Sequence, residues 1–175
     1  MARNGQVGPD AVDRILHEWS VQRPDVDASA MAVFGRLHRC FLRYQGQIGR
    51  VLEQHGINIA AFDVLAALRR AGEPYRRTAG DLAAAGLIST AGISLRADRL
   101  EKAGLIVRER DDEDRRIVYL RLTPKGLAVV DEAVSDHFAN ELDMLAGLSQ
   151  AQRDRLAQLL GSLERSLEDT RHPEG

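Results

Sequence analysis

The chain has 175 residues, of which 44% are hydrophobic and 29% are charged, values typical of one soluble globular domain with a sizeable core. No apolar run approaches the roughly 20 residues of a membrane span, and residues 1–10 lack the apolar core of a signal peptide, so we expect a cytoplasmic protein. The single cysteine, Cys40, excludes an internal disulfide. Because it falls within an apolar helical pattern, a buried structural thiol is favoured over a redox sensor.

Charge is distributed unevenly along the chain, although the net charge is only −2. Residues 1–68 hold 7 basic and 7 acidic side chains, residues 69–126 hold 13 and 9, and residues 127–175 hold 4 and 10. Only the central segment is therefore basic, which favours nucleic acid as its partner. Of the 24 basic residues, 22 are arginine, whose planar guanidinium suits phosphate and base edges. A compositional bias of the whole genome would also explain this abundance of arginine.

Two helices are expected ahead of the basic segment. Apolar residues at helical spacing from Pro9 onward predict the first, which ends at Arg23–Pro24. A longer apolar stripe predicts a second helix that runs to about Gln54 and stops at His55–Gly56. Residues 1–8 are expected to be disordered.

The next segment has the pattern of a helix-turn-helix. Asn58 predicts the cap of a helix over residues 59–70, and a loop is expected over residues 72–77. Thr78 and Asp81 resemble a capping box that opens a short helix. A turn at residues 86–88 then leads to a second helix. Ser89 and Thr90 are suited to cap the start of this helix, and Gly104 is suited to end it in a left-handed conformation.

A hairpin follows this second helix. Residues 105–110 and 116–122 predict two strands, joined by a polar turn at residues 111–114. Arg115 and Arg116 stand at the tip of the hairpin. A short helix, a tight turn, a second helix and an arginine-tipped hairpin are together the layout of a winged helix-turn-helix that binds DNA.

The chain closes with two more predicted helices. Thr123–Pro124 is a good start for the first, and Ser149 with Gln152 makes a capping box for a last, leucine-rich helix. The terminal helical regions, 9–54 and 124–170, carry more leucine than one small domain buries. A homodimer is favoured over packing within the same chain, and it places two recognition helices roughly 34 Å apart to read a palindrome.

We therefore expect a mainly α (α+β) protein. Residues 1–175 form a single domain in which residues 58–123 are the winged helix-turn-helix and the terminal helices dimerise.

Three spaced motifs resemble the MarR family of bacterial winged-helix regulators: Asp98 to Ile106 (DRLEKAGLI), Asp111-x-x-Asp114-Arg115-Arg116, and Leu122-Thr-Pro-x-Gly126. The resemblance covers nearly the whole chain. It implies the fold, dimerisation through the terminal helices and repression of transcription. By position it also implies DNA contacts from Thr78, Ser89, Thr90, Ser94, Arg96, Arg99, Arg115 and Arg116.

The resemblance assigns roles to the two wing arginines. Arg115 would enter the minor groove, where arginine senses groove width and negative potential, and Arg116 would meet Asp98 or a phosphate. Two positions depart from the family pattern. Leu95 stands where relatives often have Asn, so one polar contact is expected to be missing, and Glu113 stands where some relatives have a wing arginine.

A subgroup of this family has an extra N-terminal helix and responds to urate or related anions. The resemblance extends to its ligand residues, which here are Trp19, Asp63, Arg96 and Arg108. An aromatic face and a guanidinium suit a flat anion, and Asp63 could pair with an arginine when the site is empty. The alternatives are that Trp19 only packs the first helix on the core, that Asp63 and Arg108 form a structural ion pair, and that Arg96 serves only phosphate. Some relatives answer to citrate or aconitate, so the ligand stays open.

An enzyme is not expected, because the sequence has no Gly-rich phosphate loop and its five histidines are scattered without metal-ligand spacing. No cofactor or metal is expected either.

The expected function is repression of a nearby gene by binding to double-stranded DNA. Repression is expected to end when a small anion such as urate or a tricarboxylate releases the protein from a palindromic operator. Phenolic acids as ligands, or a ligand-independent nucleoid-type binder with a steep salt dependence and no preferred site, are the alternatives.

Overall fold

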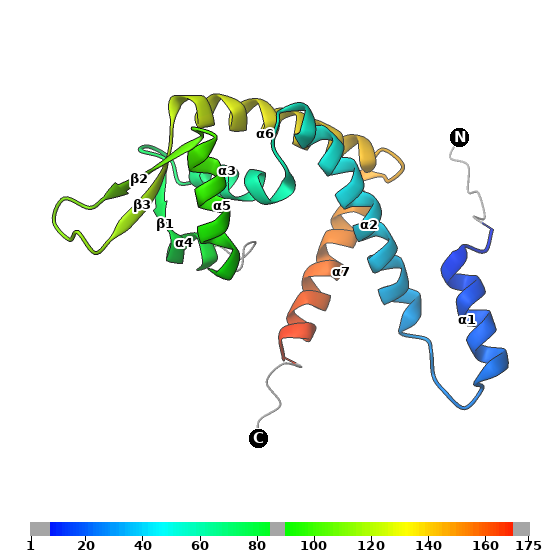
Figure 1. Cartoon of the computed structure of the whole chain (residues 1–175). Helices are drawn as coiled ribbons and strands as arrows, with labels where there is room; N and C mark the ends of the chain where they lie inside the picture. Colours follow the sequence, from blue (N-terminus) through cyan, green and yellow to red (C-terminus); the bar gives the residue numbers. More distant parts are fainter. Residues whose placement is uncertain (1–7, 85–89, 170–175) are drawn as a thin grey trace, which may run out of the picture. The chain divides into compact units, whose positions relative to one another are not determined.

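A computed structural model describes residues 8–84 and 90–169, and Figure 1 shows the labelled elements. Contacts divide the chain into two compact units, Met1–Arg50 and Val51–Gly175. Within the described ranges the chain is mostly helical, with a three-stranded antiparallel sheet in the second unit. The predicted fold class is confirmed.

The first unit is built from α1 (Ala11–Gln22) and most of α2 (Met31–Gln54). Asp10 caps α1, because its carboxylate accepts from the backbone N–H groups of Val12 and Asp13. Arg36 of α2 reaches Asp10 and Asp13 at 3.0 and 2.6 Å. The side chain of Val12 packs against Gly35, where an added Cβ would lie 3.1 Å from a Val12 methyl carbon. These contacts hold the two helices of this unit together.

Cys40 of α2 is exposed, so the prediction of a buried thiol is wrong. Phe34, Leu37 and Phe41 of the same helix are also substantially exposed. Helical periodicity predicts where an apolar stripe lies but not whether another element covers it. Among the described residues of the first unit, no element covers this part of α2.

The second unit holds most of the predicted elements. They are α3 (Ile59–Arg70), β1 (Arg76–Thr78), α4 (Ala79–Ala84), α5 (Thr90–Lys102), β2 (Ile106–Arg110), β3 (Val118–Leu122), α6 (Pro124–Met144) and α7 (Gln150–Asp169). The predicted caps are confirmed at Asn58, which accepts from the Ala61 N–H at 2.9 Å, and at Thr123, which accepts from the Gly126 N–H at 2.9 Å. The capping boxes at Thr78 and Ser149 are also present.

The sheet has the strand order β1-β3-β2, and both pairs are antiparallel. The hairpin of β2 and β3 was predicted, whereas β1 was expected to be a loop. Only three residues long, β1 shows too little alternation to be predicted locally. It is a strand because the free edge of β3 offers backbone partners, with Thr78 opposite Tyr119 and Arg76 opposite Arg121.

The core of the second unit surrounds α3. Leu65 and Leu68 are fully buried, as is Val64. Helices α5 and α6 both pack on α3 and contribute Ile93 and Val130 to this core. The recognition helix of the predicted module is thereby anchored on a rigid base.

The end of α5 joins the start of α6 at one crowded point. Gly104 has a φ of 70°, so the predicted left-handed C-cap is confirmed, and the Leu105 N–H donates to the Leu100 carbonyl at 2.9 Å. The Leu105 carbonyl accepts from the Thr123 N–H at 3.1 Å. A Cβ at Gly126 would overlap this carbonyl and lie 2.8 Å from its carbon. Only glycine fits at residue 126 without moving the backbone.

Gly126→Ala is therefore expected to lower the free energy of unfolding by about 3 kcal/mol, because the new methyl group meets backbone rather than a movable side chain. Thermal and urea unfolding monitored by circular dichroism measure the change. Gly49→Ala is the matched control, since a Cβ there has no neighbour within 4 Å and lies inside a helix. Equal stabilities for the two variants would contradict this account of the junction.

Candidate nucleic-acid interface and ligand cavity

Helix α5 presents a distinct outer face. Ile93, Ala97 and Leu100 are buried, so the helical repeat turns Ser94 and Leu95 away from the core. Both of these side chains are exposed, as are Asp98 and Arg99 further along the helix. In a helix-turn-helix such an outward face is the one that enters the major groove.

The beginning of α5 is only partly described. Ser89, the turn at residues 86–88 and the side chain of Thr90 lie outside the described residues. Thr78, at the other end of the helix-turn-helix, is engaged in the cap of α4: its hydroxyl donates to the Asp81 carboxylate at 2.8 Å and accepts from the Asp81 N–H. These bonds hold the pKa of Asp81 below its usual value. Thr78 therefore positions the entrance to α4.

The wing tip is organised by two aspartates. Asp111 accepts from the backbone N–H groups of Glu113 and Asp114, both at 3.0 Å. The Asp114 carboxylate accepts from the backbone and guanidinium of Arg116 at 3.0 and 3.1 Å. Arg115 is exposed beside this turn and, within the described part of the chain, has no acidic partner. The carboxylates thus shape the turn and leave Arg115 available to DNA.

The suggestion that Arg116 meets Asp98 is wrong. Arg116 pairs locally with Asp114, and its side chain is 91% exposed. Asp98 instead pairs with Arg108 at 2.5 Å. Residues two apart in a tight turn meet more readily than residues on different elements, which explains the local pairing.

Arg108 braces the wing against α5. From β2 its guanidinium binds the carboxylates of Asp98 and Glu101, and its backbone N–H donates to Glu101. Both ion pairs raise the pKa of Arg108, hydrogen bonding to Asp98 being the larger cause. Asp98 and Glu101 are three residues apart and so share one flank of α5. The alternative ion pair between Asp63 and Arg108 is therefore not formed in the described chain.

Asp63 and Arg96 attract one another electrostatically on the opposite flank of α5. Asp63, on α3, is partly buried, and burial raises its pKa despite the attraction of Arg96, Arg70 and His137. Arg96 Nη1 is buried and, in the described structure, has no hydrogen-bond partner. A buried, unsatisfied guanidinium nitrogen is costly and marks a place where an acceptor would be favoured.

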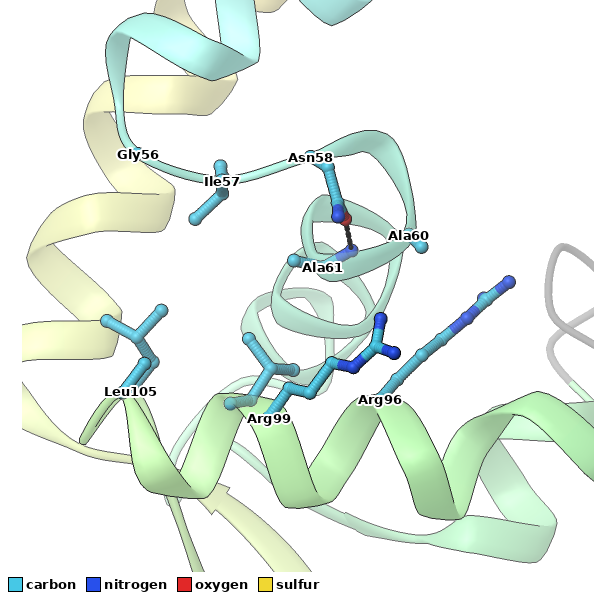
Figure 2. A pocket seen from close by; sticks show the side chains of 10 residues that line it. Gly56, Ile57, Asn58, Ala60, Ala61, Arg96, Arg99 and Leu105 are labelled. Atoms are coloured by element: carbon cyan, nitrogen blue, oxygen red, sulfur yellow. Dashed lines mark hydrogen bonds between the residues drawn. The ribbon is translucent and has the colours of Figure 1, made fainter.

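Arg96 and Arg99 also line a cavity of about 170 Å³ between α5 and the start of α3. Figure 2 shows both arginine side chains extending from α5 on the side of α3. Apart from Asn58 the other walls are small or apolar, and the cavity is lined by Gly56, Ile57, Asn58, Ala60, Ala61, Arg96, Arg99, Leu100, Ala103 and Leu105. Two guanidinium-bearing residues in an otherwise apolar pocket suit a small anion with an apolar body.

Trp19 belongs to the first unit, on α1, and its side chain is 48% exposed. Of the four predicted ligand residues, Asp63 and Arg96 attract one another within the second unit, while Arg108 is engaged with carboxylates on the other flank of α5.

Sequence reasoning missed several residues that shape these sites. Asp98 and Glu101 hold Arg108, and their spacing of three residues on a helix was the available signal. Arg76 of β1 stacks over the ring of Tyr119, 4.3 Å from its centroid, and this contact ties β1 to the wing. The spacing of Asp98 and Glu101 does not name Arg108 as their partner, and no local pattern predicts the contact between Arg76 and Tyr119.

Metal-binding clusters and membrane-spanning helices are not found in the described part of the chain. Its residues contain no group of three or more His, Cys, Asp or Glu side chains that could hold a metal ion. No helix among them is long and apolar enough to cross a membrane.

Comparisons with known proteins relate this geometry to a family. The model of the MarR family matches residues 55–117, which hold the helix-turn-helix and most of the wing. The HTH-type transcriptional regulator PecS of Dickeya dadantii is 35% identical over 160 residues, covering 91% of this chain and 96% of PecS. The chain belongs to the MarR family.

Solved structures of MarR-family regulators share the fold. Bordetella bronchiseptica BpsR, whose DNA binding is regulated by 6-hydroxynicotinic acid, is 29% identical with a TM-score of 0.68, over 75% of this chain and 92% of BpsR. A mutant of E. coli MarR in complex with operator DNA has a TM-score of 0.68 at 22% identity, and the match covers 79% of this chain and 99% of the MarR chain. This likeness concerns the fold alone. This MarR-family chain is a DNA-binding transcriptional regulator and not an enzyme.

Arg115→Ala is expected to weaken DNA binding about tenfold, because the wing loses an exposed guanidinium. The slope of log affinity against log salt concentration should become shallower by about 1 for each wing arginine removed. Fluorescence anisotropy across a salt series measures both. Arg23→Ala removes the same charge at the end of α1 and should bind DNA as the parent does; equal affinities for the two variants would overturn the wing assignment.

Arg108→Ala is expected to weaken DNA binding severalfold through loss of the brace, since Asp98 and Glu101 then face DNA as unpaired negative charges. Asp98→Asn combined with Arg108→Ala should recover part of the affinity, because it removes one of those charges. Binding titrations at fixed low salt give the comparison. A single variant that binds like the parent would show that the brace is irrelevant to the interface.

Proposed function

We propose that this MarR-family chain is a homodimeric repressor of a nearby gene that leaves a palindromic operator when a small anion binds beside Arg96. The observation that carries the proposal is the buried Nη1 of Arg96, on the recognition helix itself, which has no hydrogen-bond partner among the described residues. An acceptor that satisfies this atom is bound in direct contact with the element that reads DNA.

The dimer is supported by apolar side chains left exposed on the terminal helices. In the second unit Phe138 and Leu142 of α6 are exposed, as are Leu156, Leu159, Leu160 and Leu167 of α7. The leucines of α7 lie at helical spacing and form one stripe. A stripe of this kind is typical of an interface, because burying it against an identical copy removes apolar surface from water.

The proposed release by an anion is supported by the negative charge of Asp63, because a bound anion would compete with this carboxylate for Arg96. In the empty protein Asp63 attracts Arg96 across the boundary between α3 and α5. A bound anion competes for Arg96 and repels the Asp63 carboxylate, so it favours a different position of α5. A coupling of about 1–3 kcal/mol changes operator occupancy many-fold.

The size of the cavity restricts the ligand. Its volume is about 170 Å³, and a dry cavity of roughly 150 Å³ is known to admit a single benzene ring. A planar acid of one ring therefore matches this volume, and a two-ring anion such as urate would occupy it only in part. Regulation of BpsR by 6-hydroxynicotinic acid, a one-ring acid, is consistent with this class.

The first experiment is binding to DNA from upstream of the protein's own gene, titrated with urate, xanthine, citrate, salicylate and 6-hydroxynicotinate. Release by a planar anion, with micromolar to millimolar potency, is the expected result. Release by citrate alone would keep the anion site and change the ligand class. Binding that none of these compounds disturbs would overturn anion release, and equal affinity for all DNA sequences would identify a nucleoid-type binder.

Asp63→Asn is expected to blunt release of DNA even at saturating anion, because the variant has no carboxylate for the anion to displace from Arg96 or to repel, so anion binding is no longer coupled to the position of α5. The measurement is the same anisotropy titration, repeated with the variant. Asp143→Asn, an exposed carboxylate at the end of α6, is the control and should respond as the parent does. Release of the Asp63→Asn protein to the same extent as the parent would contradict the competition.

Leu159→Asp is expected to shift the protein toward monomer and to lower operator affinity at least tenfold, because a charge is costly inside an apolar interface. Analytical ultracentrifugation and operator titration report the two effects. Gln158→Asp places the same carboxylate on the opposite face of α7 and should leave a dimer. A Leu159→Asp protein that is still dimeric at nanomolar concentration would rule out this interface.

A further inference from the structure

One side chain on the outer face of α5 does not fit a purely polar reading surface. Leu95 is 57% exposed, in the first half of the 13-residue recognition helix. Its position is about 200° around the helix from the buried Ile93, at 100° per residue. No rotation of its side chain therefore takes it into the core.

Single exposed leucines are common and usually need no explanation. The position of Leu95 is different, because it occupies the middle of the face that a recognition helix turns toward the base edges. Its neighbour Ser94 is polar and exposed. Leu95 is thus an apolar group at the centre of a surface that meets DNA.

The chemistry of leucine limits what it can recognise there. Its isobutyl group neither donates nor accepts a hydrogen bond, so it cannot read the donor and acceptor pattern of a base. In the major groove the C5-methyl group of thymine is the apolar feature that distinguishes one base from the others. Packing of Leu95 against this methyl removes apolar surface of both partners from water.

The surroundings of Leu95 are compatible with close approach to DNA. Asp98 lies three residues further along the same helix and would repel phosphate as a free carboxylate. It is neutralised by Arg108, whose Nη2 lies 2.5 Å from a carboxylate oxygen of Asp98. The brace from the wing therefore removes an electrostatic obstacle next to Leu95.

We infer that Leu95 is a specificity-determining residue that selects thymine by packing against its C5-methyl group, once in each half-site of the operator. The sequence comparison suggested only a missing polar contact at this position. An apolar contact replaces it, so the preferred base changes although the fold does not. The inference concerns base recognition and is independent of whether an anion releases the protein.

The test begins with selection of high-affinity sites by the full-length protein from a random duplex pool. We expect an invariant thymine at one symmetric position of each half-site. Each thymine of the selected site is then replaced by deoxyuridine, which lacks only the methyl group. At the Leu95 position the parent protein should bind about fourfold more weakly per substituted half-site, and about fifteenfold more weakly when both are substituted.

The variants assign the methyl effect to this residue. Leu95→Ala should bind the thymine and deoxyuridine sites equally, whereas Leu95→Met should retain most of the difference. Leu95→Asn should prefer adenine at this position, because Asn can form two hydrogen bonds with adenine. Val21→Ala, an equally exposed apolar side chain on α1, is the control and should discriminate as the parent does.

Three results would overturn the inference: a selected site without a preferred thymine, a parent protein indifferent to every deoxyuridine substitution, or a Leu95→Ala protein that still discriminates. A comparison of cytosine with 5-methylcytosine at the same position gives an independent check, since only the methyl differs. Folding of each variant is confirmed by its unfolding midpoint. All of these measurements are made without added ligand, so a failure of anion release does not affect them.

Discussion

The backbone junction at Leu105 is the contact on which the rest of the DNA-binding unit depends. Its N–H closes the C-cap of α5 on the Leu100 carbonyl, while its own carbonyl accepts from Thr123 at the start of α6. Gly126 lies against the same carbonyl and leaves no room for a side chain. The recognition helix, the wing and the helix that follows are thus fixed to one another within a few ångströms of backbone. A shift of α5 is transmitted directly to both neighbours.

Around this junction, charged groups act on the two flanks of α5 with different consequences. On one flank Arg108 ties Asp98 and Glu101 to the wing, which makes helix and hairpin a single reading surface. On the other flank Asp63 and Arg96 link α5 to α3 by attraction that burial opposes. The second link is the weaker, since Arg96 Nη1 is left unsatisfied within the described structure. It is therefore the natural place for a ligand to act, as the proposed function requires.

The proposed division of labour at the DNA surface follows from side-chain chemistry. Arg115 at the wing tip supplies charge, which gives affinity that depends on salt and little on sequence. Leu95 supplies no charge and no hydrogen bonds, so any contribution from it depends on which base carries a methyl group. Affinity and specificity in this regulator would then rest on different elements, the wing and the recognition helix.

The sequence determined the features that depend on neighbours a few residues away. The caps at Asn58, Thr123 and Ser149 and the left-handed Gly104 were all readable, because each is a contact or a conformation within one turn of helix. The hairpin was readable from alternation for the same reason.

Tertiary structure decided what depends on residues distant in the chain. Strand β1 exists because β3 offers an edge, Cys40 is exposed because no described element of the first unit covers its face of α2, and Arg108 meets carboxylates on α5 rather than Asp63. The cavity beside Arg96 likewise arises where α3 and α5 approach each other. A local pattern fixes which face of an element is apolar or charged, but only packing fixes what that face meets.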